Sequence, residues 1–418
     1  MTRFVLVGGG VATAATATGL REGGFDGEIV IVAGESHLPY ERPPLSKEYL
    51  AGTFAVTDFQ ANDESWYSDN AVELVLGTRV LAVSPGERRV SLSDGRPLGY
   101  DALVLATGVR ARTLPGFDGD RVHALRTLAD SERLGSRLVA GSRLAVLGAG
   151  FVGCEVAAVA AARGVRVTVF EPEPLPLGRA LGPEVGRAIT GIHAENGVEI
   201  RTGQVIRSMT ETGSGLELTT RDGEVVECDE LLVGVGSVPN VELAVAAGLE
   251  VGGAAGGGIL TDEFGRTSAP DVYAIGDVAE RFYPPHGRRI RVEHHDTAVK
   301  HGANTARNLL GEAEPFTDRH FFWSHQYDHN LQSLGRFTAE GTRVVRGSLE
   351  ERSFTVFSLV DGRIGAMVAL NRPRDLLQAR KVMAVPHEVT ADQLADEEFP
   401  LKSLLPSKAS ARRSEVAG

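Results

Sequence analysis

The sequence predicts an α/β fold built from two parallel, doubly wound sheets, followed by a smaller C-terminal α+β domain. Two stretches, beginning near residues 5 and 144, each have the order strand, glycine turn, helix, strand, which is the unit of parallel sheets. After about residue 316, aromatic residues cluster and short apolar–polar alternations follow, which predicts an antiparallel sheet. A chain of 418 residues is also too long for a single hydrophobic core.

In the first unit, an apolar strand at residues 5–7 enters a run of three glycines, and a second apolar strand covers residues 28–33. Such a turn at a helix N-terminus can bind a diphosphate, because the amide groups attract an anion and glycine leaves it room. The third small position of the motif is Thr13, so the match is imperfect. We expect a Rossmann-like dinucleotide site, with a carboxylate for the ribose hydroxyls, formed by Gly8, Gly10, Val11, Ala12 and Glu35.

The second unit repeats this arrangement with a complete G-x-G-x-x-G motif at residues 148–153, after the strand at residues 144–147. Glu171 closes the following strand, and Glu173 is the alternative. A carboxylate there accepts hydrogen bonds from a ribose 2′-hydroxyl and repels a 2′-phosphate, which favours NADH over NADPH. The expected contacts of this site are Gly148, Gly150, Phe151, Val152, Glu171 and Arg179.

Other segments fill in the predicted domains. Three later apolar strands also run into glycine, at residues 102–106, 230–233 and 272–275. Residues 297–310 have the pattern of a helix. In the C-terminal domain, alternation predicts strands, for which the clearest stretches are residues 352–359 and 364–369.

The composition limits the function classes. The net charge is −12 and the pI is about 5.5, which disfavours nucleic acid as a partner. Cys154 and Cys228 lie far apart in the sequence, so we expect no disulfide framework and no metal site. The first strand begins almost at the initiator Met and no apolar run is long enough to span a bilayer, so a cytoplasmic location is expected.

Two dinucleotide sites in one chain restrict the reaction. A nicotinamide donates two electrons as a hydride, and the simplest second dinucleotide that accepts them is a flavin. A disulfide reductase would need a redox cysteine pair beside the flavin, and the sequence has no such pair. We therefore expect an FAD enzyme that oxidises NADH and passes the electrons to an external acceptor.

Several local runs resemble the NADH-dependent ferredoxin reductases of bacterial oxygenase systems. Residues 37–47, HLPYERPPLSK, are similar to the flavin loop of that family, and residues 267–277, TSAPDVYAIGD, are similar to a later signature. Further similar runs are ATG at 106–108, G-x-G-x-x-PN at 234–240, FWS-x-QYD at 322–328 and NRPR at 371–374. The resemblance covers residues 3 to about 385. One run, RVEHHD at 291–296, instead is similar to apoptosis-inducing factor, a relative with the same three-domain fold.

The resemblance implies roles for individual residues. Arg42 would supply a cation to the flavin diphosphate, and Asp277 would cap a helix and bind the ribityl chain. Lys47 would lie by the flavin ring and pair with Glu155. These two are the expected catalytic residues, since their charges could tune the flavin, although a buried Lys–Glu pair is plausible only if both charges are compensated.

Further expected contacts lie around the flavin. Trp323 would partly shield it, and His294, or alternatively His295, would face it. His325 stands where the family commonly has Asp, a departure that bears on the local charge near Trp323. The remaining expected flavin contacts are Ala106, Thr107, Gly108, Arg110 and Gly276. One further cofactor contact is expected at Gly236, in the glycine run after the strand at 230–233.

The resemblance thus implies an NADH:ferredoxin oxidoreductase in which FAD takes a hydride from NADH and delivers single electrons to an iron–sulfur ferredoxin, which would feed an oxygenase. The expected domains are 1–112 and 243–316 for FAD, 113–242 for NADH, a C-terminal domain at 317–406 and a flexible tail at 407–418. A basic patch would dock the acidic ferredoxin. Its candidates are Arg288, Arg289, Arg291, Arg372, Arg374, Arg380 and Lys381.

Two alternatives stay open. An NADH oxidase or peroxidase of the same fold would need a redox cysteine near residues 42–47, where the sequence has none. A redox-responsive flavoprotein like apoptosis-inducing factor would use a long-lived reduced flavin to change an interaction. The run at 291–296 favours that alternative.

Overall fold

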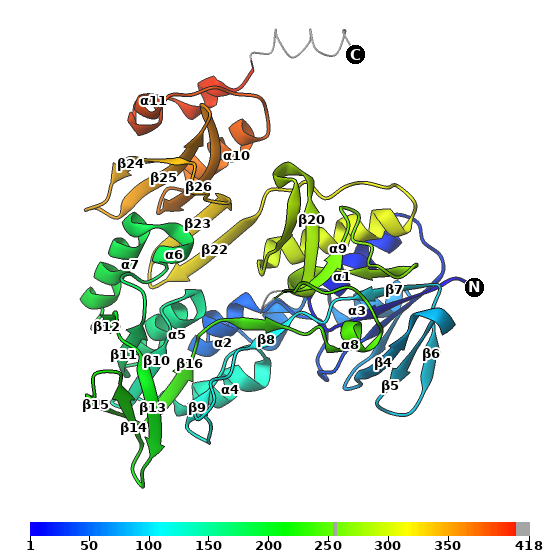
Figure 1. Cartoon of the computed structure of the whole chain (residues 1–418), viewed down its shortest axis with the longest axis horizontal. Helices are drawn as coiled ribbons and strands as arrows, with labels where there is room; N and C mark the ends of the chain where they lie inside the picture. Colours follow the sequence, from blue (N-terminus) through cyan, green and yellow to red (C-terminus); the bar gives the residue numbers. More distant parts are fainter. Residues whose placement is uncertain (254–256, 407–418) are drawn as a thin grey trace. The chain divides into compact units, whose positions relative to one another are not determined.

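The structure is a computed structural model that describes residues 1–253 and 257–406 (Figure 1). Its contacts divide the chain into two compact units. The first unit contains residues 1–112, 124–135 and 235–318, and the second contains residues 113–123, 136–234 and the chain from 319 onward. Residues 124–135, expected with the NADH domain, thus pack with the first unit. The expected tail at 407–418 lies outside the described residues.

A parallel sheet forms the centre of the first unit. Its strands lie in the order β19 (Val272–Ala274), β7 (Ala102–Leu105), β1 (Arg3–Val7), β2 (Glu28–Val32) and β3 (Val72–Val75). All neighbours are parallel. The carboxyl ends of these strands therefore meet at one edge, where parallel sheets place their ligands. Gly8, Ala106 and Gly276 follow three of the strands at that edge.

The sheet of the first unit is covered on both faces. Phe4 and Leu6 belong to the core shared with helices α1 (Val11–Glu22) and α9 (His295–Leu309). Val5 and Val7 belong to the core on the other face, with the valines of an antiparallel sheet. Burial of both faces explains why these strands are apolar throughout rather than alternating. That second sheet consists of β4 (Val80–Ser84), β5 (Arg89–Leu92) and β6 (Pro97–Gly99).

The other elements of the first unit are short. They connect the strands or form two separate small sheets. They are α2 (Glu48–Ala51), α3 (Glu64–Asp69), α8 (Glu242–Ala246), the start of α4 (Leu128–Arg137), β8 (Val109–Ala111), β17 (Ser237–Pro239), β18 (Ile259–Thr261), β20 (Ala279–Tyr283), β21 (Arg288–Arg291), and the 3-10 helices η1 (Pro43–Ser46), η2 (Val56–Phe59), η3 (Pro85–Glu87), η4 (Gly276–Val278) and η5 (Pro284–His286). One small sheet consists of β8 with β17, and the other of β18, β20 and β21.

The second unit contains another parallel sheet. Its strands lie in the order β12 (Glu199–Thr202), β11 (Arg166–Glu171), β10 (Arg143–Leu147), β16 (Glu230–Val233) and β9 (Val122–His123). Helix α5 (Phe151–Ala162) follows the second glycine turn. The unit also holds α6 (Gly178–Leu181), α7 (Pro183–Glu195) and the antiparallel strands β13 (Ile206–Glu211), β14 (Leu216–Thr220) and β15 (Val225–Cys228).

The C-terminal segment is the predicted antiparallel sheet with helices. Its strands lie in the order β22 (Phe321–Gln326), β23 (His329–Gly335), β26 (Arg363–Leu370), β25 (Ser353–Val360) and β24 (Thr342–Ser348). Helix α10 (Pro373–Met383) buries Ala379 and Val382 against this sheet, and α11 (Ala391–Ala395) and η6 (Leu401–Leu404) add to the same core. The α/β class with a C-terminal α+β domain is thus confirmed. Within the described ranges, no helix is long and apolar enough to cross a membrane.

Candidate cofactor sites

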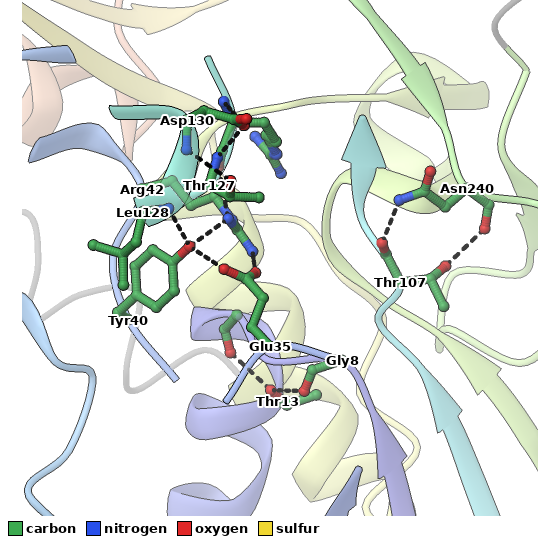
Figure 2. Close-up of polar contacts among 12 residues, drawn as sticks. Gly8, Thr13, Glu35, Tyr40, Arg42, Thr107, Thr127, Leu128, Asp130 and Asn240 are labelled. Atoms are coloured by element: carbon green, nitrogen blue, oxygen red, sulfur yellow. Dashed lines mark hydrogen bonds and ion pairs between the residues drawn. The ribbon is translucent and has the colours of Figure 1, made fainter. Parts of the chain in front are cut away.

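The first glycine turn closes against the end of β7. Gly8 has a φ of +143°, and a Cβ on it would lie 2.2 Å from the carbonyl oxygen of Ala106. Thr13 donates its hydroxyl to the carbonyls of Gly8 at 3.0 Å and Gly10 at 2.7 Å (Figure 2). The imperfect third position of the motif therefore contributes to the turn, since its hydroxyl ties the first residue of the turn to the helix.

The space in front of helix α1 is open. A Cβ on Gly10 would meet no atom of another described segment within 4 Å. Gly10 is the N-cap of α1, and no side chain in the described part of the chain caps the helix there or places an acid in its first turn, where Val11 and Ala12 lie. Amide groups facing open space at the positive end of a helix suit a diphosphate. The turn therefore fits the dinucleotide predicted for it.

A half-buried polar cluster lies beside this turn, as Figure 2 shows. The hydroxyl of Tyr40 donates to Glu35 Oε2 at 2.6 Å and accepts from Arg42 Nη1 at 2.8 Å and from the amide of Leu128 at 3.2 Å. Arg42 Nη2 pairs with Glu35 Oε1 at 2.8 Å, and its Nη1 also donates to the carbonyl of Arg126 at 2.6 Å. The cation predicted for the diphosphate is thus fixed by a carboxylate and a carbonyl.

The pKa values in this cluster follow from burial and charge. Burial alone would raise the pKa of Glu35, but the adjacent Arg42 and the hydrogen bonds from Tyr40 and Arg42 hold it below its usual value. Burial raises the pKa of Tyr40, and the carboxylate of Glu35 adds to this effect. Burial opposes the charge on Arg42, yet Tyr40 and Glu35 raise its pKa overall. Near neutral pH the cluster therefore holds a carboxylate, a phenol and a guanidinium.

Asp277 occupies a different position from the one expected. It lies inside η4, whose N-cap is Ile275, and the N-cap of α9 is His294. The expectation that Asp277 caps a helix is therefore wrong, because Gly276, with a φ of +68°, turns the chain one residue earlier. The carboxylate of Asp277 instead pairs with Arg126 Nη2 at 2.7 Å. Its contact with a ribityl chain stays a prediction.

The loop after β7 is held by an asparagine. Thr107 donates its hydroxyl to the carbonyl of Asn240 at 2.8 Å, and the Asn240 amide donates to the carbonyl of Thr107 at 2.8 Å (Figure 2). Gly108 has a φ of +63°, which favours glycine, and a Cβ there would lie in ordinary contact with Arg126 Nη2 at 3.5 Å. Arg110 points to Asn240 Oδ1 and pairs with Glu242, so its expected cofactor contact competes with two protein partners.

The remaining residues predicted beside the flavin lie in both units. In the first unit, Lys47 is 8% exposed at the end of η1, and His294 is the half-buried N-cap residue of α9, where desolvation lowers its pKa to about 4. His295 Nε2 lies 3.5 Å from Glu41. In the second unit, Glu155 is 5% exposed and accepts a hydrogen bond from Ser324, and Trp323 stacks on Phe321. The Lys47–Glu155 pair stays a prediction.

The second glycine turn uses its third glycine for packing. A Cβ on Gly153 would lie 2.1 Å from the carbonyl oxygen of Gly148, so no larger residue fits. Glu171 accepts from the amides of Ala149 at 2.7 Å and Glu173 at 2.9 Å. A Cβ on Gly150, the N-cap of α5, would meet open space, so this helix N-terminus also fits a diphosphate.

The other residues predicted for the second site are placed as follows. Phe151 and Val152 begin α5, and Val152 is exposed. Arg179 is exposed in α6. Gly236 precedes β17 in the first unit and has a φ of +99°. The first two residues thus lie at the turn, as predicted, while the nucleotide contact of Arg179 stays a prediction.

The predicted basic patch is partly neutralised. Arg291 pairs with Glu293 at 2.6 Å, and Arg372 pairs with Asp375 at 3.0 Å and with Glu397. Arg380 lies over the ring of Phe321, 4.8 Å from its centroid. A docking surface would therefore depend on the remaining candidates more than on Arg291 and Arg372, which have carboxylate partners.

Sequence reasoning missed three residues that organise the first site. Tyr40 and Asn240 lie inside family-like runs, and their positions in those runs could have indicated them. Arg126 gave no signal, because a single arginine before a helix has no motif. Its segment was also expected in the other domain, whereas it packs in the first unit.

Comparisons with known proteins cover nearly the whole chain. Residues 2–302 match the pyridine nucleotide-disulphide oxidoreductase family, and residues 321–405 match the reductase C-terminal family. The ferredoxin–NAD(+) reductase component of an anthranilate 1,2-dioxygenase system from Burkholderia cepacia is 42% identical over 405 residues, 96% of this chain and 99% of that protein. Rhodocoxin reductase from Rhodococcus erythropolis is 36% identical, over 99% of this chain and 97% of that protein.

A solved structure agrees with these relatives. Putidaredoxin reductase, in its covalent complex with putidaredoxin, has a TM-score of 0.92 at 35% identity and covers 98% of this chain and 99% of its own. The resemblance inferred from the local motifs is thereby confirmed. The chain belongs to the pyridine nucleotide-disulphide oxidoreductase family and is an oxidoreductase that uses a flavin and a nicotinamide nucleotide.

Proposed function

We propose that this chain is an FAD-dependent NADH:ferredoxin oxidoreductase of an oxygenase system. The burial of both cysteines is the observation that favours an external electron acceptor over a cysteine pair within the protein. Cys154 is 0% and Cys228 2% exposed, and burial raises the pKa of both thiols, that of Cys228 to about 12. Neither can serve as the redox thiolate of a disulfide reductase or peroxidase. The relatives named as ferredoxin reductases support a ferredoxin as that acceptor.

The first turn is the proposed FAD site. Its helix N-terminus faces open space at Gly10, and Arg42 supplies a guanidinium beside it. An arginine suits a diphosphate because its planar fork can donate two parallel hydrogen bonds. When bound, the flavin would accept a hydride from the nicotinamide and release the two electrons one at a time.

The second turn is the proposed NADH site. Glu171 already accepts hydrogen bonds from two backbone amides, which fixes its carboxylate beside the turn. A carboxylate there can still accept a ribose 2′-hydroxyl through its remaining lone pairs, but it repels a 2′-phosphate. Glu171→Ser should therefore reduce the preference for NADH over NADPH by roughly tenfold or more, as measured by kcat/KM with each nucleotide. An unchanged ratio would argue against this role.

Lys47 and Glu155 are the proposed residues that act on the flavin. Both are buried ionisable groups, which proteins rarely keep without a partner or a role. Their task would be positioning and electrostatic tuning, because hydride transfer depends mainly on holding donor and acceptor in contact.

The acceptor is tested by stopped-flow mixing. Protein that has been reduced anaerobically with one equivalent of NADH is mixed with an oxidised [2Fe–2S] ferredoxin in one experiment and with air-saturated buffer in another. We expect fast reduction of the ferredoxin and slow reaction with oxygen. Fast oxygen consumption would instead indicate an NADH oxidase. A reduced protein that reacts with neither would indicate a redox-responsive flavoprotein.

A further inference from the structure

A buried chain of hydrogen bonds in the second unit ends on the carboxylate of Glu155. We propose that Ser324, Gln326 and His193 are positioning residues that hold this carboxylate in one orientation for hydride transfer. The proposal rests on the proposed function, because it takes Glu155 as part of the hydride-transfer site. It also gives a role to Ser324, Gln326 and Tyr327 of the FWS-x-QYD run, which the cofactor sites leave unexplained.

The chain is continuous over four contacts. Tyr327 lies with its hydroxyl 3.2 Å from His193 Nδ1, and His193 Nε2 lies 2.9 Å from Gln326 Oε1. The Gln326 amide nitrogen lies 3.2 Å from Ser324 Oγ, which lies 2.6 Å from Glu155 Oε1. Ser324, Gln326 and His193 are each 2% exposed or less. Water therefore has little access to replace a lost partner in the chain.

The chemistry of the groups gives every bond the same direction. Gln326 offers its carbonyl oxygen to His193, so Nε2 of the imidazole must carry the proton and donate. Nδ1 is then the acceptor, and the Tyr327 hydroxyl donates to it. The Gln326 amide donates to Ser324 Oγ, which leaves the serine proton for Glu155. Each donor is thus oriented by the one before it, and the last one fixes the carboxylate.

The ionisable groups around the chain keep it in this state. Burial lowers the pKa of His193, more than the Gln326 hydrogen bond raises it, so the imidazole stays neutral near pH 7. Burial raises the pKa of Tyr327, so its phenol stays a donor. Cys154, beside Glu155 on α5, is a buried thiol whose pKa is raised by burial and by the charges of Glu155 and Glu171. The imidazole of His193 and the phenol of Tyr327 therefore stay neutral around neutral pH.

The Tyr327 end of the hydrogen-bond chain is held in place by the NRPR run at residues 371–374. Tyr327 has a φ of +55° in the turn between β22 and β23. Asn371 exchanges two hydrogen bonds of 2.9 Å with the backbone of Asn330 on β23, and its amide donates to His329 Nδ1 at 2.8 Å and to the carbonyl of Arg352 at 2.9 Å. The second unexplained motif thus holds the turn that presents Tyr327.

The positioning role is tested by one substitution that removes the hydroxyl of Ser324 and a second that keeps a hydroxyl there. In the FAD-loaded protein, Ser324→Ala should lower the limiting rate of flavin reduction at saturating NADH by roughly tenfold, because one hydrogen bond to a buried carboxylate is lost. The NADH dissociation constant should change less than twofold. Ser324→Thr, which keeps a hydroxyl, should recover most of the rate.

Two further variants separate positioning from general damage. Ser333→Ala removes another buried serine hydroxyl from the neighbouring strand β23, where it donates to the carbonyl of Met367 at 3.0 Å, and should leave the rate unchanged. In a Glu155→Gln background, Ser324→Ala should add no further loss, because the two residues act through one contact. If Ser324→Ala folds poorly, Gln326→Met is the substitute, and it should lower the limiting rate of flavin reduction in the same way.

These measurements test the positioning role of Ser324, Gln326 and His193 independently of the proposed ferredoxin reductase activity. Additive losses from Ser324→Ala and Glu155→Gln, or equal losses from Ser324→Ala and Ser333→Ala, would overturn the positioning role. So would a rise in the NADH dissociation constant with no change in the limiting rate. The wild-type reaction with ferredoxin is measured in parallel, so failure of the proposed function would appear there and not in the variants alone.

Discussion

The two glycine turns differ at the third position of the motif and in what their carboxylates bind. In the first turn, Thr13 fills the third position with a side chain whose hydroxyl donates to two turn carbonyls. In the second turn, the same position is Gly153, and a Cβ there would overlap the carbonyl of Gly148. One turn is thus tied together by a side chain, and the other depends on its absence.

The acids of the two turns differ in the same way. Glu35 binds side chains, Arg42 and Tyr40, whereas Glu171 binds the backbone amides of its own turn and loop. The first acid therefore fixes a cation beside the turn, whereas the second fixes the backbone of its own turn. An arginine favours a ligand with an exposed diphosphate, and a carboxylate that has lone pairs left to accept hydrogen bonds favours ribose hydroxyls. Similar glycine motifs can thus be prepared for different parts of a dinucleotide.

The largest expected effect comes from giving the second turn a side chain. Gly153→Ala should destabilise the protein by about 2–3 kcal/mol and abolish NADH binding, because the new Cβ forces the helix away from the turn. Urea unfolding and NADH titration measure the two effects. Thr13→Ala is the matched change in the first turn and should cost only about 1 kcal/mol, the value of its hydrogen bonds. Equal costs for both variants would contradict the comparison.

Removal of the cation should weaken the first site next. Arg42→Met leaves Glu35 without its ion pair and the diphosphate without its guanidinium. The FAD dissociation constant should rise roughly 10–100-fold, since a hydrogen bond to a charged group contributes about 1.5–3 kcal/mol. Flavin release followed by fluorescence gives the constant. Arg42→Lys keeps the charge and should recover only part of the affinity, so full recovery would argue against a forked contact.

Acid should weaken the same cluster by a smaller amount. The pKa of Glu35 is held below its usual value, so its ion pair stabilises the folded protein fully above about pH 4.5 and is lost as the pH falls through the lowered pKa. Glu35→Gln should therefore reduce the free energy of unfolding by about 1 kcal/mol at pH 6, and by progressively less as the pH falls through the lowered pKa. A difference that grows on acidification would show the opposite sign and contradict the assignment.

The sequence was sufficient for the central strands of both parallel sheets and for both turns, because these depend on local patterns. Apolar runs followed by glycine mark the strand ends, and Gly153 is required by a close approach to Gly148 within its own motif. The close approach that requires Gly8 is instead to Ala106, at the end of the neighbouring strand β7. The Arg126–Asp277 pair could not be predicted, because it joins residues 151 positions apart and neither carries a local signature of the contact. The cap expected at Asp277 failed for a local reason, the left-handed backbone of Gly276.

Filling the space in front of each helix should show whether the two turns bind two different dinucleotides. A Cβ on Gly10 or Gly150 meets open space, and neither residue has a positive φ, so Gly10→Val and Gly150→Val should fold normally. Bound flavin per chain and NADH affinity are measured for both. Gly10→Val should lose the flavin, and Gly150→Val should keep the flavin and lose its reduction by NADH. A Gly10→Val protein with full flavin, or a Gly150→Val protein without flavin but with unchanged NADH affinity, would contradict the account.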